Sequence, residues 1–252
     1  MLVTGSSGGI GSATARAFAE HGAALVLHFH TQRTSVETLR RELSVPAAII
    51  GADLRDEAAA EQLFVEAVRL FPRIDALVVN AGIWCGDAVP LHEMSLAQWR
   101  TTLDADLTSA FLTCRAYLRH LAAAPREAAS IVLVGSTAAL FGEADHADYS
   151  AAKAGLVYGL TRSLKNEIVR LAPRGRVNCV CPGWTHTPMA EAHVADAELM
   201  HRVYATIPMQ KIATPEDVAA AIVFLSSDKL AGHLSGTILP IAGGMEGRLL
   251  NP

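Results

Sequence analysis

Cysteine, charge of one sign and long apolar runs are all scarce in this chain of 252 residues. Only 18% of the residues are charged, the formal net charge is -4, and like charges form no run. This balance suits neither nucleic acid nor an anionic membrane, so neither partner is expected. No stretch reaches about 18 uncharged apolar residues, and the glycines from Gly5 onward leave no apolar core for a signal peptide. We therefore expect a cytoplasmic protein.

The cysteines are Cys85, Cys114, Cys179 and Cys181. Without an export signal they are expected to be reduced thiols. Cys179 and Cys181 lie in the apolar run VNCVC, which is typical of a strand, and their spacing is one residue short of a CxxC pair. Buried core thiols are therefore favoured over metal ligands, and no metal site is expected.

Apolar residues, in contrast, make up 51% of the chain, and the mean hydropathy is +0.27. This composition argues against disorder. A chain of about 250 residues with an α/β pattern is commonly one unit. Because no internal repeat, low-complexity segment or linker divides the sequence, residues 1–252 are predicted to form a single domain.

Short apolar runs alternate with amphipathic stretches from end to end. The apolar runs predict strands at residues 1–3, 24–29, 47–50, 76–79, 130–134, 177–180 and 236–240. The amphipathic stretches predict helices at residues 11–21, 35–43, 57–70, 96–123, 149–171 and 215–226. Near-continuous Val, Ile and Leu runs are typical of strands buried on both faces of a parallel sheet. The pattern predicts a doubly wound α/β fold, a seven-stranded parallel sheet of Rossmann type with helices on both faces.

One long segment, residues 184–208, fits no strand-helix rhythm. A connection of this length inside a compact domain is usually functional. We interpret it as a partly helical lid over the ligand cleft.

The motif TGSSGGIG at residues 4–11 lies between the first predicted strand and the first predicted helix. Glycines permit a tight turn and let the backbone approach a pyrophosphate, which the unpaired amides and the dipole of the helix N-terminus stabilise. A flexible strand-helix turn is the alternative. Three glycines and a Thr-Gly start directly after an apolar strand favour nucleotide binding.

Tyr149 and Lys153 stand four residues apart at the start of a predicted helix, so their side chains share one helix face. An ammonium about 4 Å from a phenolate, at an effective dielectric near 20, lowers the phenol pKa by up to about 3 units before desolvation is counted. A phenol shifted toward neutrality serves as an acid or a base. A surface Tyr and Lys would be the commoner outcome for an isolated YxxxK. Ser136 changes this balance, because it follows the run IVLVG at the carboxyl end of a predicted central strand, where open α/β sheets bind ligands.

Together these features resemble the short-chain dehydrogenase/reductase family over nearly the whole chain. The matching positions, in the family's order and spacing, are the glycine turn, Asp53, Asn80-Ala81-Gly82, Ser136, Tyr149, Lys153, Pro182 and Gly183 with Thr187, and the closing GTILPIAGGM. Gly5, Gly9 and Gly11 fit the TGxxxGxG of the compact subfamily, whereas Gly5, Gly8 and Gly11 fit the TGxxGxxG of the longer epimerase-like subfamily. The length of 252 residues and the closing segment favour the compact subfamily, which includes enzymes similar to 3-oxoacyl-carrier-protein reductase.

The resemblance implies an enzyme that transfers a hydride between NAD(P) and an alcohol or carbonyl compound, with the protein positioning a cofactor that carries the chemistry. Tyr149 would exchange the proton with the substrate oxygen, and Ser136 would hydrogen-bond that oxygen. Lys153 would lower the pKa of Tyr149 and hold the nicotinamide ribose. The residues expected to contact the cofactor are Gly5, Ser6, Ser7, Gly9, Ile10, Gly11, His30, Arg33, Asp53, Leu54, Asn80, Ala81, Gly82, Tyr149, Lys153, Pro182, Gly183, Thr185 and Thr187.

Asp106 departs from the family pattern, because the family usually has Asn at this position, and it is our fourth candidate for the catalytic group. Its carboxylate is expected near Lys153, where it can accept hydrogen bonds but, when ionised, cannot donate one. A proton relay that needs only an acceptor survives this change. A solvated Asp, with the relay role absent or taken by Asp104, is the alternative. Asp106 also favours a second hypothesis, a nucleotide-sensing protein without turnover, but the intact Ser136, Tyr149 and Lys153 weigh against it.

The end of the second predicted strand bears on the choice of cofactor. Phe29 stands where an acid would accept the ribose hydroxyls of NAD. Groups that suit a 2'-phosphate lie nearby instead: His30, Arg33, Ser6 and Ser7. Gly8 argues against NADP, because NADP-preferring relatives often have a basic residue at this position. NADP is predicted over NAD, at about two to one.

The sequence does not identify the substrate. The residues expected to line its pocket are Trp84, Phe141, Glu143, His146, Trp184 and Met189. Each has a plain alternative, which is lid or core packing for the aromatic residues and a solvated loop position for Glu143 and His146. An acyl substrate on a carrier protein would need a basic rim, for which the candidates are Arg115, Arg119, Arg126 and Arg170, although exposed arginines more often only contact solvent.

The predicted helices 96–123 and 149–171 carry small and apolar residues on more than one face. A helix that is apolar beyond a single stripe needs a second partner. The family resemblance implies a homodimer or homotetramer built on these two helices.

Overall fold

The computed structural model describes residues 1–84 and 88–247, so Cys85 lies outside the described residues. In this part of the chain, seven parallel strands form one sheet in the order β3-β2-β1-β4-β5-β6-β7. The strands are β1 (Leu2–Val3), β2 (Leu25–Phe29), β3 (Ala47–Gly51), β4 (Ala76–Val79), β5 (Ser130–Val134), β6 (Arg176–Pro182) and β7 (Ile238–Ile241). Every predicted strand is present, and the predicted doubly wound parallel sheet is confirmed.

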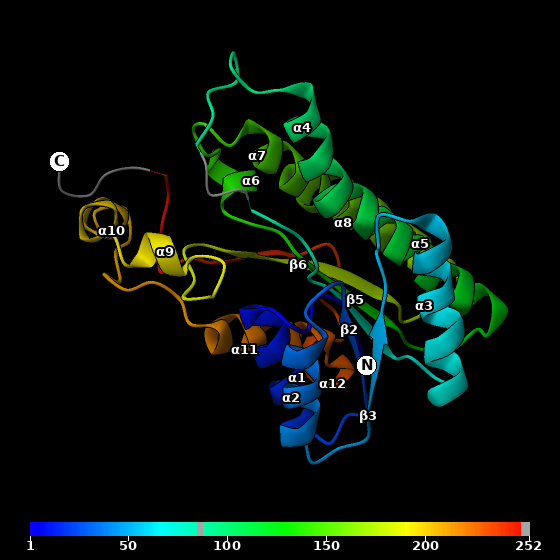
Figure 1. Cartoon of the computed structure of the whole chain (residues 1–252). Helices are drawn as coiled ribbons and strands as arrows, with labels where there is room; N and C mark the ends of the chain where they lie inside the picture. Colours follow the sequence, from blue (N-terminus) through cyan, green and yellow to red (C-terminus); the bar gives the residue numbers. More distant parts are fainter. Residues whose placement is uncertain (85–87, 248–252) are drawn as a thin grey trace.

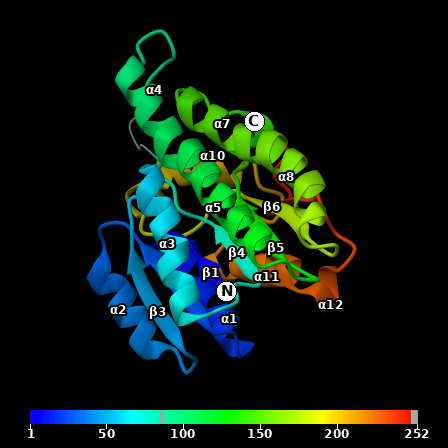
Figure 2. The same ribbon diagram turned by 90° about the vertical axis from the view of Figure 1, so that its right-hand side faces the viewer.

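Helices cover both faces of this sheet (Figure 1). Their bounds are α1 (Gly9–Glu20), α2 (Arg33–Glu42), α3 (Glu57–Leu70), α4 (Leu96–Leu103), α5 (Ser109–Ala123), α6 (Ala138–Phe141), α7 (Ala147–Ala154), α8 (Thr161–Glu167), α9 (Glu191–Val194), α10 (Ala197–Tyr204), α11 (Pro215–Ser226) and α12 (Asp228–Ala231). On one face α1 packs against α11. On the other face α3 packs against α5, and α8 lies on the same side (Figure 2).

The strands at the centre of the sheet are buried along their whole length, as their continuous apolar runs predicted. Successive side chains alternate between two apolar clusters, one on each face of the sheet. Leu77 and Ile131 belong to the cluster under α3 and α5, whereas Val78 and Val132 belong to the cluster under α1 and α11. This two-sided core holds the carboxyl ends of the strands in a row, and the loops that follow them carry the candidate site.

The predicted helix 96–123 is interrupted, which corrects the expectation of one regular helix. Between α4 and α5 the chain widens into a π-helical turn, η1 (Asp104–Thr108). In the second predicted long helix a similar turn, η2 (Gly155–Leu160), separates α7 from α8, and the 3₁₀ turn η3 (Ile168–Arg170) follows. Single π turns inside α-helices are frequent at functional sites. Here η1 contains the buried Asp106.

The short helices α6 and α12 were missed by the sequence pattern, because four residues are too few for a clear helical period. Two further short helices, α9 and α10, lie within residues 184–208, the segment that was expected to be partly helical. Met200, Val203 and Ile207 form a small apolar cluster there, against which Trp184 and Met245 pack. Across the described ranges, the helices are too short or too polar for a bilayer span.

Candidate active site

A cavity of about 970 Å³ lies at the carboxyl edge of the sheet. The loops that follow β1, β2, β3, β4, β5 and β6 all contribute to its wall. Open α/β sheets bind their ligands at this edge, near the point where the strand order reverses. In this sheet the reversal lies between β1 and β4, directly under the glycine turn.

The glycine turn is built so that side chains would not fit. Gly5 has a φ of +65°, a conformation that favours glycine. A Cβ on Gly11 would lie 2.2 Å from the Gly5 carbonyl oxygen, and one on Gly9 would lie 2.9 Å from Thr187 Cγ2. A Cβ on Gly8 would meet only the Gly5 oxygen, at an ordinary 3.6 Å. The close approaches therefore require Gly5, Gly9 and Gly11, the pattern of the compact subfamily, and place no such demand on Gly8.

The loop after β4 is hydrogen-bonded to the glycine turn. The backbone N–H groups of Asn80 and Ala81 donate to Thr4 Oγ1 at 2.9 and 3.0 Å. The Asn80 amide donates to the Thr4 and Gly5 carbonyl oxygens at 3.0 and 3.2 Å. These bonds connect β1 with β4 across the reversal point and hold the glycine turn in place.

The cavity residues fit a dinucleotide. Helix α1 begins at Gly9 without a side-chain cap, so the amide groups of its first turn remain available to an anion. Gly5, Gly8 and Gly9 of the turn line the cavity, so backbone without side chains forms this part of its wall. The cavity continues from His30 and Asp53 at one end to Ser136 and Tyr149 at the other.

Most of the predicted cofactor residues line this cavity. They are Gly5, Ser7, Gly9, Ile10, His30, Asp53, Leu54, Asn80, Ala81, Gly82, Tyr149, Lys153, Pro182, Gly183, Thr185 and Thr187. Ser6, Gly11 and Arg33 do not. Ser6 is buried and its hydroxyl donates to the Val3 carbonyl at 2.8 Å. Arg33 is exposed and its Nε donates to Glu37 Oε1 at 2.8 Å, so His30 and Ser7 remain as the predicted phosphate-binding residues that line the cavity.

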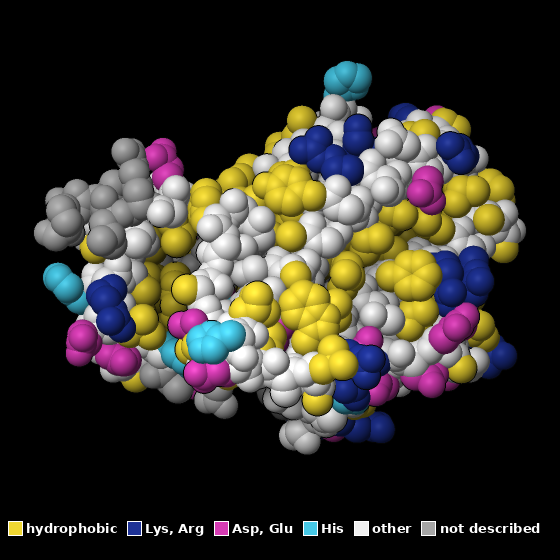
Figure 3. All heavy atoms as spheres, turned by 90° about the horizontal axis from the view of Figure 1, so that it is seen from above, with side chains coloured by type: hydrophobic (Ala, Val, Ile, Leu, Met, Phe, Trp, Pro, Cys, Tyr) yellow, Lys and Arg dark blue, Asp and Glu magenta, His cyan; other side chains and the backbone are white. Residues whose placement is uncertain are grey.

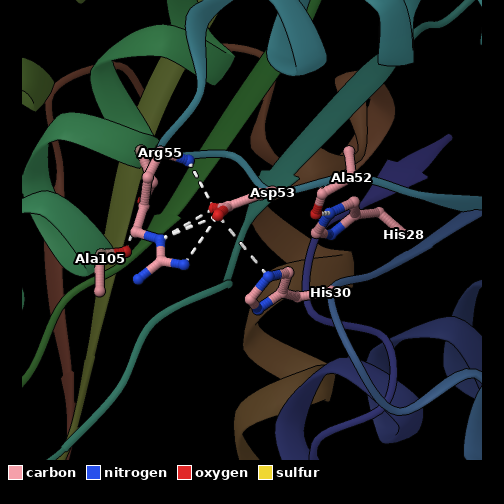
Figure 4. A network of polar contacts seen from close by, with 7 residues as sticks. His28, His30, Ala52, Asp53, Arg55 and Ala105 are labelled. Carbon is pink, nitrogen blue, oxygen red and sulfur yellow. Dashed lines mark hydrogen bonds and ion pairs between the residues drawn. The ribbon is translucent and has the colours of Figure 1, made fainter.

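His28 was missed by the sequence analysis, although it interrupts the apolar run LVLHF (Figure 4). Its Nδ1 accepts a hydrogen bond from the Gly5 N–H at 3.1 Å, so the ring proton must lie on Nε2, which is 3.0 Å from the Ala52 carbonyl oxygen. Burial lowers the pKa of His28 to about 4. The neutral ring therefore connects the glycine turn to the end of β3.

Arg55 was also missed, and it lines the cavity beside Asp53 (Figure 4). Its Nε and Nη2 donate to Asp53 Oδ1 and Oδ2 at 2.9 and 2.7 Å, a bidentate pair. Hydrogen bonding from Arg55 lowers the pKa of Asp53 to about 2. His30 Nε2 lies 3.7 Å from the same carboxylate. The charge of Asp53 is therefore balanced by a cation at this end of the cavity.

Ser136, Tyr149 and Lys153 meet at the other end, beyond β5 and on α7. A side-chain hydrogen bond joins Ser136 to Tyr149. The Lys153 ammonium lies 5.5 Å from the centroid of the Tyr149 ring and donates to the Val134 carbonyl at 3.4 Å. The sequence-predicted trio therefore forms one connected cluster.

Asp106 lies directly behind this trio. Its Oδ2 is 3.3 Å from Lys153 Nζ, and its Oδ1 accepts a hydrogen bond from the Ile83 N–H at 2.7 Å. Both charged side chains are almost fully buried. The expectation that Asp106 lies near Lys153 is met, and the alternative of a solvated Asp106 does not apply.

Burial changes the acid-base balance of these groups. Burial raises the pKa of Tyr149, and Asp106 adds to that effect, while Lys153 and the Ser136 hydrogen bond oppose it. The net lowering of the phenol pKa that the sequence predicted is therefore not found, because desolvation exceeds the attraction of Lys153. Burial lowers the pKa of Lys153, but Asp106 and Tyr149 raise it above its ordinary value, so the side chain stays an ammonium.

Of the predicted substrate residues, Trp84, Glu143, Trp184 and Met189 line the cavity. Phe141 is exposed outside it, and His146 is buried behind the Trp84 ring with their centroids 5.2 Å apart. The proposed basic rim of Arg115, Arg119, Arg126 and Arg170 is absent from the cavity wall as described. Arg115 and Arg119 pair with glutamates of α3 instead.

The thiols are part of the buried core. Cys114, Cys179 and Cys181 are free and buried, as predicted. Within residues 1–84 and 88–247, no group of three His, Cys, Asp or Glu side chains is arranged as a set of metal ligands.

Known proteins match this chain over nearly its whole length. A family model described as Enoyl-(Acyl carrier protein) reductase matches residues 5–246. Cis-4-hydroxycyclohexanecarboxylate dehydrogenase of Sinomonas cyclohexanicum is 40% identical over 245 residues, which cover 96% of this chain and 94% of that protein. A 3-oxoacyl-[acyl-carrier-protein] reductase of Synechocystis is 35% identical over 248 residues, which cover 97% and 95% of the two chains. The crystal structure of levodione reductase has a TM-score of 0.87 at 28% identity and covers 96% of this chain and 95% of that one.

Proposed function

This chain belongs to the short-chain dehydrogenase/reductase family of oxidoreductases, and on that premise we propose that it transfers a hydride between a nicotinamide dinucleotide and an alcohol or ketone. The observation that carries the proposal is the cluster of Ser136, Tyr149 and Lys153 at one end of a cavity whose other end begins at the glycine turn. The substrate named for the 40% identical relative, a hydroxylated cyclohexane carboxylate, supports a compact cyclic alcohol or ketone as the substrate.

The cofactor would be held along the length of the cavity. The backbone of Gly5 and Gly9 and the first turn of α1 would bind its pyrophosphate. Lys153 would hold the ribose next to the nicotinamide, and Thr187 with the backbone of Gly183 would hold the amide. When bound, the nicotinamide would supply or accept the hydride.

Proton transfer belongs to Tyr149. In ketone reduction the Ser136 hydroxyl hydrogen-bonds the substrate oxygen and the Tyr149 hydroxyl gives its proton to that oxygen; in alcohol oxidation the phenolate takes the proton back. Lys153, held as an ammonium by Asp106, stabilises the phenolate. Because burial raises the pKa of Tyr149, the phenol is protonated at neutral pH, which is the form that ketone reduction needs.

We propose NADP as the preferred cofactor. The end of β2 carries the buried Phe29 in place of an acid, and His30 beside it lines the cavity. Asp53, the nearest carboxylate, is paired with Arg55, which reduces its repulsion of a 2'-phosphate. A higher kcat/KM with NAD than with NADP would overturn this preference.

A substrate screen with the purified protein tests the proposed function. Cyclic ketones are mixed with NADPH or NADH, and oxidation of the cofactor is followed by its near-ultraviolet absorbance. Tyr149→Phe should lower kcat by about 10² to 10⁴, the contribution of acid-base catalysis. Tyr158→Phe, at an exposed tyrosine of η2, is the matched control and should retain the rate. Equal rates in wild type and Tyr149→Phe would refute the role of Tyr149, and cofactor binding without turnover on every ketone would support the nucleotide-sensing alternative.

We also propose a homodimer or homotetramer in the cytoplasm. Phe111 of α5 and Tyr158 of η2 are 44% and 52% exposed. Hydrophobic side chains gather on the face of the molecule that includes these helices (Figure 3). Exposed apolar patches of this kind are typical of protein interfaces.

A further inference from the structure

Two indole rings form the walls of the substrate end of the cavity. Trp84 and Trp184 meet edge to face, with ring centroids 6.1 Å apart and an interplanar angle of 79°. His193 of α9 packs against both rings, with centroids 4.7 Å from Trp84 and 6.4 Å from Trp184. Because both indoles also line the cavity, they offer flat apolar surface to a ring-shaped substrate beside Tyr149.

Glu143 places a carboxylate against these apolar walls. The Trp84 side chain hydrogen-bonds the carboxylate, and the Glu143 N–H donates to Ser150 Oγ at 3.1 Å. Ser150 directly follows Tyr149 on α7, so this bond connects the position of Glu143 to that of the reactive phenol. The acid is partly buried, and its charge adds a small contribution to the burial that raises the pKa of Tyr149.

The charges along the cavity are unevenly distributed. Among the described lining residues, the cations are Arg55, which is paired with Asp53 at the far end, and Lys153, which is paired with Asp106. No lysine or arginine of the described wall is paired with Glu143. A partly buried carboxylate with a single indole N–H as its side-chain donor has free lone pairs for a further donor.

We infer that the preferred substrate is a cyclic ketone or alcohol whose ring lies against Trp84 and Trp184 and whose second, distal hydroxyl donates a hydrogen bond to Glu143. This inference rests on the proposed function for the reacting end of the substrate, and it adds the recognition of the opposite end. A carboxylate at the distal position would face Glu143 at short range, with no lysine or arginine of the described wall beside it, and is selected against. His193 packs behind the two indole rings, and its Nδ1 is buried without a hydrogen-bond partner.

The test compares three ketones that share one ring: cyclohexanone, 4-hydroxycyclohexanone and 4-oxocyclohexanecarboxylate. Each kcat/KM is divided by that of cyclohexanone for the same variant, so that a general loss of activity cancels. The wild type should prefer the hydroxyl over the carboxylate compound by about tenfold or more, because a hydrogen bond to a charged group discriminates at this level. Glu143→Gln should reduce this ratio about tenfold, mainly through KM.

Glu191→Gln is the matched control, because this exposed acid lies on α9 in the same segment but outside the cavity wall. It should leave the ratio unchanged within about twofold. An equal preference for the two compounds in the wild type would overturn the inference. An unchanged ratio in Glu143→Gln would overturn it as well.

Tryptophan fluorescence separates failure of this inference from failure of the proposed function. Two of the three tryptophans, Trp84 and Trp184, line the pocket, so bound ketone should change the emission. Tighter binding of 4-hydroxycyclohexanone than of 4-oxocyclohexanecarboxylate, without turnover of either, would support the subsite while refuting the enzyme. Turnover of all three ketones without discrimination would refute the subsite while supporting the enzyme.

Discussion

Lys153 and Asp106 form a buried ion pair, with the lysine Nζ 3.3 Å from Oδ2 of the carboxylate. The pair lies behind Tyr149, whose ring is 5.5 Å from the same ammonium. The two charges therefore have opposite effects on the phenol: Lys153 lowers the pKa of Tyr149, and Asp106 raises it. Asp106 lies in the π turn η1, where it is buried.

Replacing Asp106 should shift the pH dependence of alcohol oxidation. In Asp106→Asn the negative charge that raises the Tyr149 pKa is removed, so the phenolate forms at lower pH. We expect the rising limb of kcat/KM to move to lower pH, with activity within about tenfold of wild type.

Asp104→Asn is the control for this prediction, because Asp104 is exposed in the same turn. Its pH profile should match that of the wild type. A shift of the Asp106→Asn profile to higher pH would contradict the electrostatic argument.

His30 should decide the preference for NADP. His30→Asp puts a carboxylate at the end of β2, where it would accept ribose hydroxyls and repel a 2'-phosphate. The ratio of kcat/KM for NADP to that for NAD should fall by about tenfold or more. Arg33→Ala is the control, because Arg33 pairs with Glu37 outside the cavity and should change the ratio by less than about twofold. A larger fall of this ratio in Arg33→Ala than in His30→Asp would show that Arg33, not His30, contacts the phosphate.

His28 should make the protein less stable as the pH falls. Its pKa is about 4 in the folded protein against 6.5 for an ordinary histidine, so the unfolded chain binds the proton first. The stabilisation from the neutral ring is therefore complete above pH 6.5 and is lost between about 6.5 and 4. The loss amounts to about 3 kcal/mol, since each pKa unit corresponds to 1.36 kcal/mol.

Urea unfolding at several pH values measures this effect. His28→Gln keeps a hydrogen-bonding side chain that does not titrate, so its unfolding free energy should vary less between pH 6.5 and 4. Asp53 titrates at lower pH and does not enter this window. Parallel pH curves for wild type and His28→Gln would be inconsistent with a neutral buried ring.

The exposed aromatic residues on α5 and η2 should support assembly. Phe111→Asp combined with Tyr158→Asp places charges in the patch, which should lower the mass measured by light scattering at micromolar concentration. Val65→Asp, at a 42% exposed position of α3, is the control and should leave the mass unchanged. A wild-type monomer under these conditions would disprove the assembly.

The strands and the order of the motifs were predictable from the sequence alone. Seven short apolar runs predicted the strands, and the central strands β4 and β5 are buried along their whole length, as nearly continuous apolar runs predict. Once those runs were placed, the glycine turn, Asn80 and Ser136 were expected near one edge, since the carboxyl ends of parallel strands meet there. Local pattern and chain direction were sufficient for this much.

Only the tertiary structure decided which of these side chains work together. That Asp106 is buried against Lys153 and that His28 supports Gly5 are contacts between residues distant in sequence, which no local spacing encodes. The pKa of Tyr149 was also decided by the tertiary structure. The spacing to Lys153 predicted the attraction, whereas the desolvation that exceeds it depends on how completely the folded chain covers the phenol.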